Sequence, residues 1–140
     1  MCLVIKNDGN ATKAPEKTFR VFKWYEKNQT QREIKLGPDE YLSPFRFAKS
    51  KLRKGAVIVS DRKFKRLTEK EIREKEVHHG FHGFASREDA EIYANKWEGP
   101  NYLVEFSVRP RDFVARGMFD GYICESVVFK RGQVVSITKI

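Results

Sequence analysis

The sequence predicts a single α+β domain built on a mostly antiparallel sheet, either continuous or split, with two helices. Three observations support this prediction. Segments of alternating apolar and polar residues, typical of half-buried strands, recur along the 140 residues. Two segments with helix-start signals separate them, so the strands pair across long stretches of sequence. A chain of this length with 40% hydrophobic residues can bury one core and is too short for two ordinary domains, so we expect residues 1–140 to form one domain.

The first half of the chain holds strands separated by loops and one charged helix. Residues 1–17 are predicted to form a short apolar strand followed by a polar surface loop. Residues 18–25 alternate large apolar and polar side chains, which predicts the first core strand. Residues 55–60 predict a short buried strand after a region of turn signals. Thr68 begins a Thr-x-x-Glu capping box, which predicts a charged surface helix over residues 68–76.

Residues 80–94 are predicted to form a strand that turns directly into a capped amphipathic helix, and we call this segment the strand-to-helix corner. Gly80 and Gly83 allow a backbone or a ligand to come close. Ser86, three residues before Asp89, is a helix-start signal. The residues spaced for one helical face are Ala90, Tyr93, Ala94 and Trp97. We therefore expect this helix to pack against the core and the corner to be able to cradle a ligand.

Three further strands are predicted near the end of the chain. Residues 102–108 alternate and end close to Pro110, and residues 122–129 and 133–137 form the last two predicted strands. Residues 130–132 form a tight connection that is typical of a hairpin or a bulge.

The formal net charge of +9 is concentrated in residues 46–66, which we call the basic arm. This segment holds nine basic residues against the single acid Asp61, whereas residues 77–140 hold equal numbers of both signs. Such an arm attracts a phosphate backbone or an acidic protein surface through a salt-sensitive field. Its alternative role is a solvated face that keeps the protein soluble. The candidate contacts to nucleic acid or to an acidic host protein are Lys49, Lys51, Arg53, Lys54, Arg62, Lys63, Lys65 and Arg66.

Composition also argues against several classes of protein. No apolar run approaches the roughly 20 residues needed to cross a bilayer, and the apolar start is too brief for a secretory signal, so we expect a cytoplasmic protein without membrane contact. Cys2 and Cys124 are the two cysteines, which argues against a disulfide framework. Their spacing relative to His78, His79 and His82 does not suit a zinc site, so no metal is expected.

Two blocks of sequence together carry a family resemblance. The first block is a glycine, aromatic and serine pattern before a helix, formed by Gly80, Phe81, His82, Phe84, Ala85, Ser86, Ala90 and Tyr93. The second block is a glutamate that precedes an apolar strand and a Gln-Val pair, formed by Glu125, Gln133 and Val134. In this order, over residues 18–137, they resemble the ADP-ribosyltransferase fold of the poly(ADP-ribose) polymerases and diphtheria-type toxins. The resemblance implies NAD as cofactor and cleavage of its nicotinamide-ribose bond, with Glu125 holding the ribose hydroxyl and stabilising an oxocarbenium-like state.

The sequence departs from that family at two signature positions. Arg20 and Lys23 stand where a ribose-binding His or Arg is expected on the first strand, His82 replaces the stacking Tyr, and Gly83 is an extra residue. At the positions where the two blocks match the family, the resemblance implies that Glu125 and His82 are catalytic residues. It implies as cofactor contacts Arg20, Lys23, Gly80, Ser86 and Tyr93. The chain is also similar to small phage and bacterial proteins that begin Met-Cys-Leu, which implies a phage or bacterial setting but does not indicate any particular activity.

Each candidate residue also has a structural interpretation. Strand alternation predicts that Glu125 points inward among Ile123, Val127 and Phe129, where a carboxylate needs a partner or has a raised pKa. His82 either hydrogen-bonds a ribose or phosphate or is a structural strand residue. Alternation places Arg20 and Lys23 on different faces of their strand, so one of them at most faces a ligand, and a solvated strand edge is the alternative for both. Tyr93 and Trp97 are expected in the core.

Three functional hypotheses follow from these patterns. The first is a binding protein that uses a degenerate ADP-ribosyltransferase-like fold and docks its basic arm on nucleic acid or on a host protein. The second is an active NAD-dependent ADP-ribosyltransferase that modifies a protein or nucleic acid, and the third is a nucleotide sensor without turnover. The altered signature positions favour the first. A separate hypothesis is that loss of Met1 exposes Cys2 as an N-terminal nucleophile, although the motifs that follow such a cysteine in known families are not found here.

Overall fold

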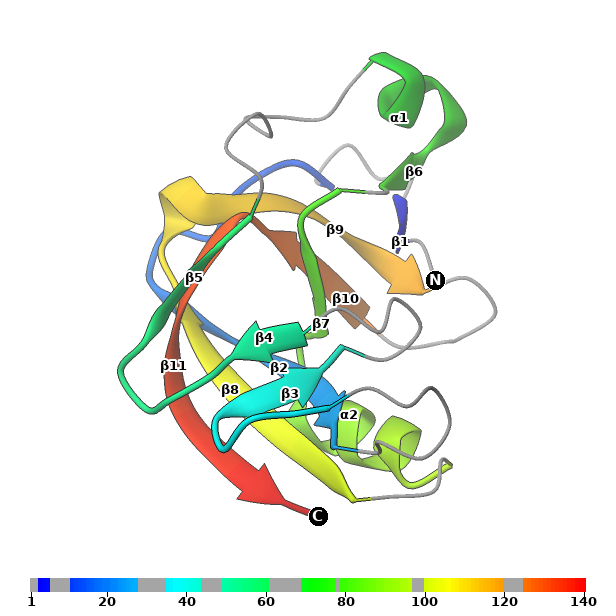
Figure 1. Ribbon diagram of the computed structural model, residues 1–140. Helices are drawn as coiled ribbons and strands as arrows, with labels where there is room; N and C mark the ends of the chain where they lie inside the picture. The colour runs from blue at the N-terminus through cyan, green and yellow to red at the C-terminus, as the bar shows by residue number, and fades with distance from the viewer. Residues whose placement is uncertain are drawn as a thin grey trace.

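A strongly curved antiparallel sheet dominates the computed structural model (Figure 1). The structure describes residues 3–5, 11–27, 35–43, 49–60, 69–77, 79–96, 100–119 and 125–140. Its strands in chain order are β1 (Leu3–Ile5), β2 (Phe19–Glu26), β3 (Glu40–Leu42), β4 (Lys49–Lys51), β5 (Val57–Val59), β6 (Glu76–Val77), β7 (Phe81–Phe84), β8 (Asn101–Val108), β9 (Phe113–Phe119), β10 (Glu125–Phe129) and β11 (Arg131–Lys139). Its helices are α1 (Glu69–Glu74) and α2 (Arg87–Ala94), with a short 3₁₀ turn at Pro110–Asp112.

The strands run in the order β5-β11-β8-β2-β7-β10-β9-β1-β6, with the β3–β4 pair branching from β2. All of these neighbours are antiparallel. The link between β2 and β7 consists of the pair Phe22 and Phe84, whereas β2 and β8 pair along their whole length. The sheet therefore bends between β2 and β7 into two halves, and the predicted single α+β domain with a mostly antiparallel sheet is confirmed.

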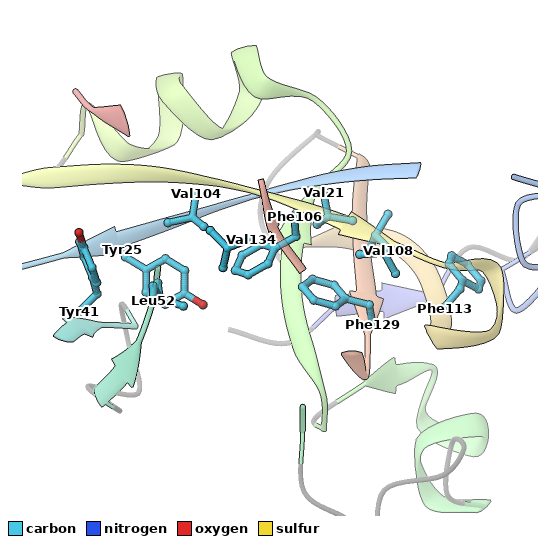
Figure 2. Close-up of a cluster of buried hydrophobic side chains, with 11 residues drawn as sticks. Val21, Tyr25, Tyr41, Leu52, Val104, Phe106, Val108, Phe113, Phe129 and Val134 are labelled. Atoms are coloured by element: carbon cyan, nitrogen blue, oxygen red, sulfur yellow. The ribbon is translucent and has the colours of Figure 1, made fainter. Parts of the chain in front are cut away.

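The main core lies on the inner, concave side of this bend. Figure 2 shows side chains from β2, β8, β10 and β11 pointing toward one another on the side of β2 and β8 away from α2. Phe129 of β10 lies with its ring centroid 5.5 Å from that of Phe106 of β8, and 5.5 Å from that of Phe81 of β7. Because Phe106 and Phe129 are completely buried, each stabilises the fold by about 1.5–3 kcal/mol. These rings join the two halves of the sheet.

The second core cluster fills the space between α2 and the outer side of β2 and β8. Ser86 caps α2 by accepting a hydrogen bond from the Asp89 N–H at 3.2 Å, as predicted. The buried residues of this cluster are Trp24, Phe84, Ala90, Tyr93, Ala94 and Leu103. Asn101 ties the helix to the sheet, since its Oδ1 accepts from Trp24 Nε1 at 3.0 Å and its Nδ2 donates to the Ala94 carbonyl at 3.0 Å. The predicted cap and packing face of the helix are confirmed, and Trp97 lies outside the described residues.

Of two predictions about strands, one is right in place but wrong in burial, and the other is wrong. Residues 55–60 were expected to form a buried strand, but Val57 and Val59 are 46% and 61% exposed because β5 ends the strand order and turns only Ile58 toward the core. The predicted hairpin or bulge at residues 130–132 is a corner instead, because β10 and β11 belong to different halves of the sheet. A Cβ on Gly132 would come within 2.9 Å of the Phe129 ring, so this corner is tightly packed.

Three smaller differences concern the loops and α1. Strand β9 was not predicted, and the loop before β2 packs partly against it: Ala11 is buried and its carbonyl accepts from the Arg116 N–H at 2.7 Å. Helix α1 ends earlier than predicted because Lys75 adopts a left-handed conformation with φ of 58°. Glu71 of α1 is buried, and its Oε2 accepts from the His79 N–H at 3.4 Å. Thr68, the predicted cap of α1, lies outside the described residues.

Candidate functional site

The two predicted catalytic residues lie on opposite faces of the sheet. In the β7–β10 register, Val127 pairs with Gly83 and Val128 pairs with His82. Cross-strand partners share a face and successive residues alternate, so Glu125 belongs to the face of Val127 and Gly83, whereas His82 belongs to the face of Val128. The structure therefore does not bring Glu125 and His82 together.

The position of Glu125 corrects the expectation that this carboxylate points into the core. Glu125 shares the inner face with Val127 and Phe129, which are both buried, but its own side chain is exposed. The reason is its place at the first residue of β10, beyond the end of the packed core. Its carbonyl accepts a hydrogen bond from the Ala85 N–H at 3.1 Å, which fixes the end of β10 against the strand-to-helix corner. Ile123, the remaining expected neighbour, lies outside the described residues.

His82 is half-buried, and both of its imidazole nitrogens are shielded from solvent. It lies on β7 opposite Val128, a completely buried residue that packs with Val77, Val114 and Ala115. This environment leaves neither ring nitrogen at the surface for a ribose or phosphate, and it fits the structural interpretation of His82.

The cations of the first strand lie on different faces, as alternation predicts. Arg20 is exposed and pairs across the strands with Ser107. Lys23 faces the inner side, where its Nζ donates to Ser43 Oγ at 3.3 Å and lies 5.1 Å from the centroid of the Tyr25 ring. Arg20 is thus available to an external partner, whereas Lys23 is engaged within the protein.

The remaining predicted cofactor contacts build the corner itself. Ser86 Oγ is occupied by the helix cap, and Tyr93 is buried against Trp24 with ring centroids 5.8 Å apart. Gly80 has a φ of 85°, a conformation that side chains disfavour. A Cβ on Gly83 would come within 2.5 Å of a Val21 methyl group and 3.0 Å of the neighbouring backbone carbonyl oxygen on β2. The close approach predicted at this glycine is therefore made by β2, a strand of the same chain.

The described part of the basic arm presents its cations to solvent. Lys49 and Lys51 are exposed on β4, while Ser50 between them is half-buried opposite the buried Tyr41 of β3. Arg53 and Lys54 follow in an exposed turn. Arg53 donates to Asp39 Oδ2 at 2.6 Å, a pair between exposed side chains that stabilises the turn by about 1 kcal/mol at most. The other predicted arm contacts lie outside the described residues, namely Arg62, Lys63, Lys65 and Arg66.

The outer face of four strands, of which β5 belongs to the basic arm, forms a polar strip with apolar residues at its edge. Cross-strand pairs place Arg20, Ser107, Gln133 and Val57 in one row over β2, β8, β11 and β5. In the next row Arg131 lies opposite Val59. Apart from half-buried Ser107, all of these side chains are exposed. Sequence reasoning did not assign Arg131, Val57 and Val59 to a site, because only the β5–β11 pairing brings them together.

Among the described residues, burial changes the proton affinity of Tyr25, Glu26 and Tyr41, which lie away from Glu125. Burial raises the pKa of the Tyr25 hydroxyl well above its ordinary value. Burial also raises the pKa of Tyr41, with smaller contributions from neighbouring Tyr102 and Asp39, and it raises the pKa of the Glu26 carboxyl. These groups lie on β2 and the β3–β4 pair, so they do not form an acid–base pair with either predicted catalytic residue.

Comparison with known proteins adds no assignment to this geometry. No protein-family model, no curated protein and no solved structure matches the chain. The resemblance to ADP-ribosyltransferases stays a prediction. In the part of the chain that the structure describes, no group of three or more His, Cys, Asp or Glu residues is placed to hold a metal ion. Neither helix in these same segments has the length and apolar character to cross a membrane.

Proposed function

We propose that this protein is a binding protein that docks on an acidic macromolecule, a nucleic acid or an acidic host protein, through its basic arm. The observation that carries the proposal is the exposure of the arm's cations. Lys49, Lys51 and Lys54 are exposed, and within the described residues the arm forms one ion pair, that of Arg53 with Asp39. Glu40 lies opposite Lys51 across β3 and β4, so the described arm has four cations beside two acids. This excess of positive charge at the surface attracts a polyanion and accelerates its association.

The placement of the candidate catalytic residues weighs against NAD-dependent transfer as the main activity. An ADP-ribosyltransferase needs its glutamate and its ribose-binding and stacking residues around one bound dinucleotide. Here Glu125 and His82 lie on opposite faces of the sheet, and Lys23, Ser86 and Tyr93 are engaged in contacts that hold the fold together. Binding without chemistry needs none of these groups to converge, so it is the simpler reading of the same geometry.

Salt dependence gives the proposal a quantitative form. Each phosphate that a lysine or arginine neutralises releases condensed counterions, and the slope of log K against log salt is close to −0.9 per contact on duplex DNA. The three exposed lysines of the described arm, together with Arg53, would give a slope of about −3.6 on duplex DNA. Binding in an uncharged pocket would change little over the same range of salt.

The test is fluorescence anisotropy with four labelled anionic probes at about 50 and 200 mM salt. The probes are duplex DNA, single-stranded DNA, RNA and polyglutamate of matched length. The arm variant Lys49→Gln/Lys51→Gln/Lys54→Gln keeps the Arg53–Asp39 pair, and the control variant Lys17→Gln/Lys70→Gln/Lys139→Gln removes the same charge from exposed sites elsewhere.

We expect the arm variant to weaken binding of the preferred probe by about tenfold or more, and the control variant to weaken it by about threefold or less. Equal losses in the two variants would show that net charge alone governs binding and would contradict a role for the arm. Absence of salt-sensitive binding to all four probes would contradict the proposed function.

A further inference from the structure

Strand β5 offers unused backbone hydrogen-bonding groups at the end of the sheet. Within the described residues it pairs with β11 alone. The Ser60 N–H donates to the Lys130 carbonyl at 2.9 Å, and the Val134 N–H donates to the Ala56 carbonyl at 2.8 Å. Along an antiparallel strand, backbone groups point alternately toward one neighbour and the other. The N–H and C=O groups of Ile58 therefore point toward β11, whereas those of Val57 and Val59 point away from it. The outer edge of β5 thus presents two donors and two acceptors in strand geometry.

The side chains of this edge are apolar and exposed. Val57 and Val59 are 46% and 61% exposed. They belong to the small set of large hydrophobic residues that are exposed in the described part of the chain. Proteins commonly protect an edge strand with a lysine, a proline, a bulge or an inward-pointing charge, because an open edge recruits other strands. The Val-Ile-Val sequence of β5 carries none of these four devices, and its short length of three residues is the remaining protection. An edge with this composition is typical of a site that accepts an added strand.

Charge around β5 specifies what kind of strand it would accept. The segment that leads into β5 and contains it, residues 49–60, holds four cations and is followed by the single acid Asp61, and Arg131 is exposed directly opposite Val59. A second copy of the chain would bring the same basic residues together, at a net charge of +9 for each copy. An acidic partner gains attraction from the same groups. Nucleic acid complements the positive charge but not the hydrogen-bonding groups of the β5 edge. Its phosphates accept hydrogen bonds and donate none to the carbonyls of Val57 and Val59.

We infer that the edge of β5 docks an extended acidic segment of a partner protein, which adds to the sheet as a further strand. The inference rests on the proposed function and narrows its partner from acidic macromolecules in general to acidic protein segments. Alternate residues of the added strand would lie on the face of Val57 and Val59, where small apolar side chains fit. Its acidic residues would face Arg131 and the cations of the basic arm.

The test uses a fluorescein-labelled peptide of about ten residues that alternates glutamate and valine, the length of a long natural strand. A glutamate–serine peptide of the same length and charge is the peptide control, and single-stranded DNA of matched charge is the nucleic-acid control. Val59→Pro removes an outward-facing N–H and leaves the bonds of Ile58 and Ser60 to β11 in place. Val57→Thr/Val59→Thr keeps the shape and strand preference of both side chains but makes them polar. Ile92→Thr, at an exposed position of α2, is the matched control variant.

We expect the glutamate–valine peptide to bind more tightly than the glutamate–serine peptide and the DNA. Val59→Pro should weaken binding of this peptide by about tenfold, because one or two backbone hydrogen bonds are lost. The double threonine variant should weaken it by about threefold or more, because the apolar contact is lost. Ile92→Thr should leave binding unchanged. Thermal unfolding of each variant shows whether it is folded, and the threonine pair serves as the test if the proline variant is not.

Four results would overturn the inference. Peptide binding that neither β5 variant weakens would show attraction by charge alone. If the DNA binds and the peptide does not, the result supports the proposed function and contradicts the docking site on β5. If neither probe shows salt-sensitive binding, the result contradicts both the proposed function and the docking site. A dimer in sedimentation equilibrium that Val59→Pro dissociates would assign the edge to a second copy of the chain.

Discussion

The strand-to-helix corner and the basic arm use their polar groups in opposite ways. In the corner, Ser86 caps α2, and Asn101 of the neighbouring β8 hydrogen-bonds both the Trp24 indole and the last turn of the helix. In the arm, Lys49 and Lys51 project into solvent from β4, and Val57 and Val59 are exposed on β5 at the end of the strand order. The segment with the clearest sequence pattern therefore stabilises the fold, whereas the described cations of the segment with the plainest charge run are exposed to solvent. Substitutions in the corner should therefore change stability, and substitutions in the arm should change binding.

The largest expected effect on stability comes from Asn101. Asn101→Ala leaves the buried Trp24 N–H and the Ala94 carbonyl without their partner, which should lower the free energy of unfolding by about 2–4 kcal/mol. Urea unfolding monitored by tryptophan fluorescence measures this change. Asn95→Ala, at the exposed end of α2, is the control and should change it by about 0.5 kcal/mol or less. Equal effects of the two variants would contradict a structural role for the corner.

Gly83 should give the next largest effect. A methyl group at this position meets a Val21 methyl and the β2 backbone at distances that force β7 and β2 apart, so Gly83→Ala should cost about 1–3 kcal/mol. Gly37→Ala is a suitable control because its nearest atom belongs to the end of the flexible Glu40 side chain. If Gly83→Ala left stability unchanged in urea unfolding, the glycine would be required by something other than the approach of β2.

Alkaline pH should destabilise the protein through Tyr25. Burial raises the pKa of Tyr25, so the native state keeps its proton at a pH where the unfolded chain releases it. Its contribution is complete below about pH 10, the ordinary tyrosine pKa, and falls by about 1.4 kcal/mol for each further pH unit. Tyr25→Phe removes this proton, so its stability should decline less between about pH 9 and 11 than that of the wild type. Parallel declines in urea unfolding would show that Tyr25 is not protected from ionisation.

Loss of the helix cap should have a smaller effect. Ser86→Ala removes the acceptor for the Asp89 N–H and should lower stability by about 1 kcal/mol. Ser107→Ala on the outer strip should have an effect of about 0.5 kcal/mol or less, since this side chain is only half-buried and caps no helix. A loss in Ser86→Ala no larger than in Ser107→Ala would mean that α2 is held by packing alone. Thermal unfolding of both variants makes the comparison.

Local sequence patterns predicted the strands in which apolar and polar residues alternate. They missed the features that depend on pairing between strands far apart in the sequence. Residues 18–25 and 102–108 alternate because one side of each strand faces the main core, and the structure has β2 and β8 there. Strand β9 was missed because Phe113, Val114, Ala115 and Gly117 are all buried, so no alternation marks it. The hairpin predicted at residues 130–132 was wrong because a short connection between two strands is also typical of a corner between sheet halves.

The candidate site was predictable to the same limited extent. Charge counting found Lys49, Lys51 and Lys54, whose exposure follows from the cost of burying a charge. Alternation placed Arg20 and Lys23 on different faces, but it could not show that β10 begins at Glu125, where the core ends. The exposed edge of β5 was hidden for a related reason: a run of Val, Ile and Val predicts burial unless the position of the strand in the sheet is known.

The most direct test of the central claim compares the arm with the predicted catalytic glutamate in one titration. The measurement is the dissociation constant of the preferred anionic probe at about 50 mM salt for the wild type, for Lys49→Gln/Lys51→Gln/Lys54→Gln and for Glu125→Gln. Binding through the arm predicts a loss of about tenfold or more in the lysine variant and no loss in Glu125→Gln. Weaker binding in Glu125→Gln, with the lysine variant unchanged, would place the functional site at the strand-to-helix corner and contradict this account.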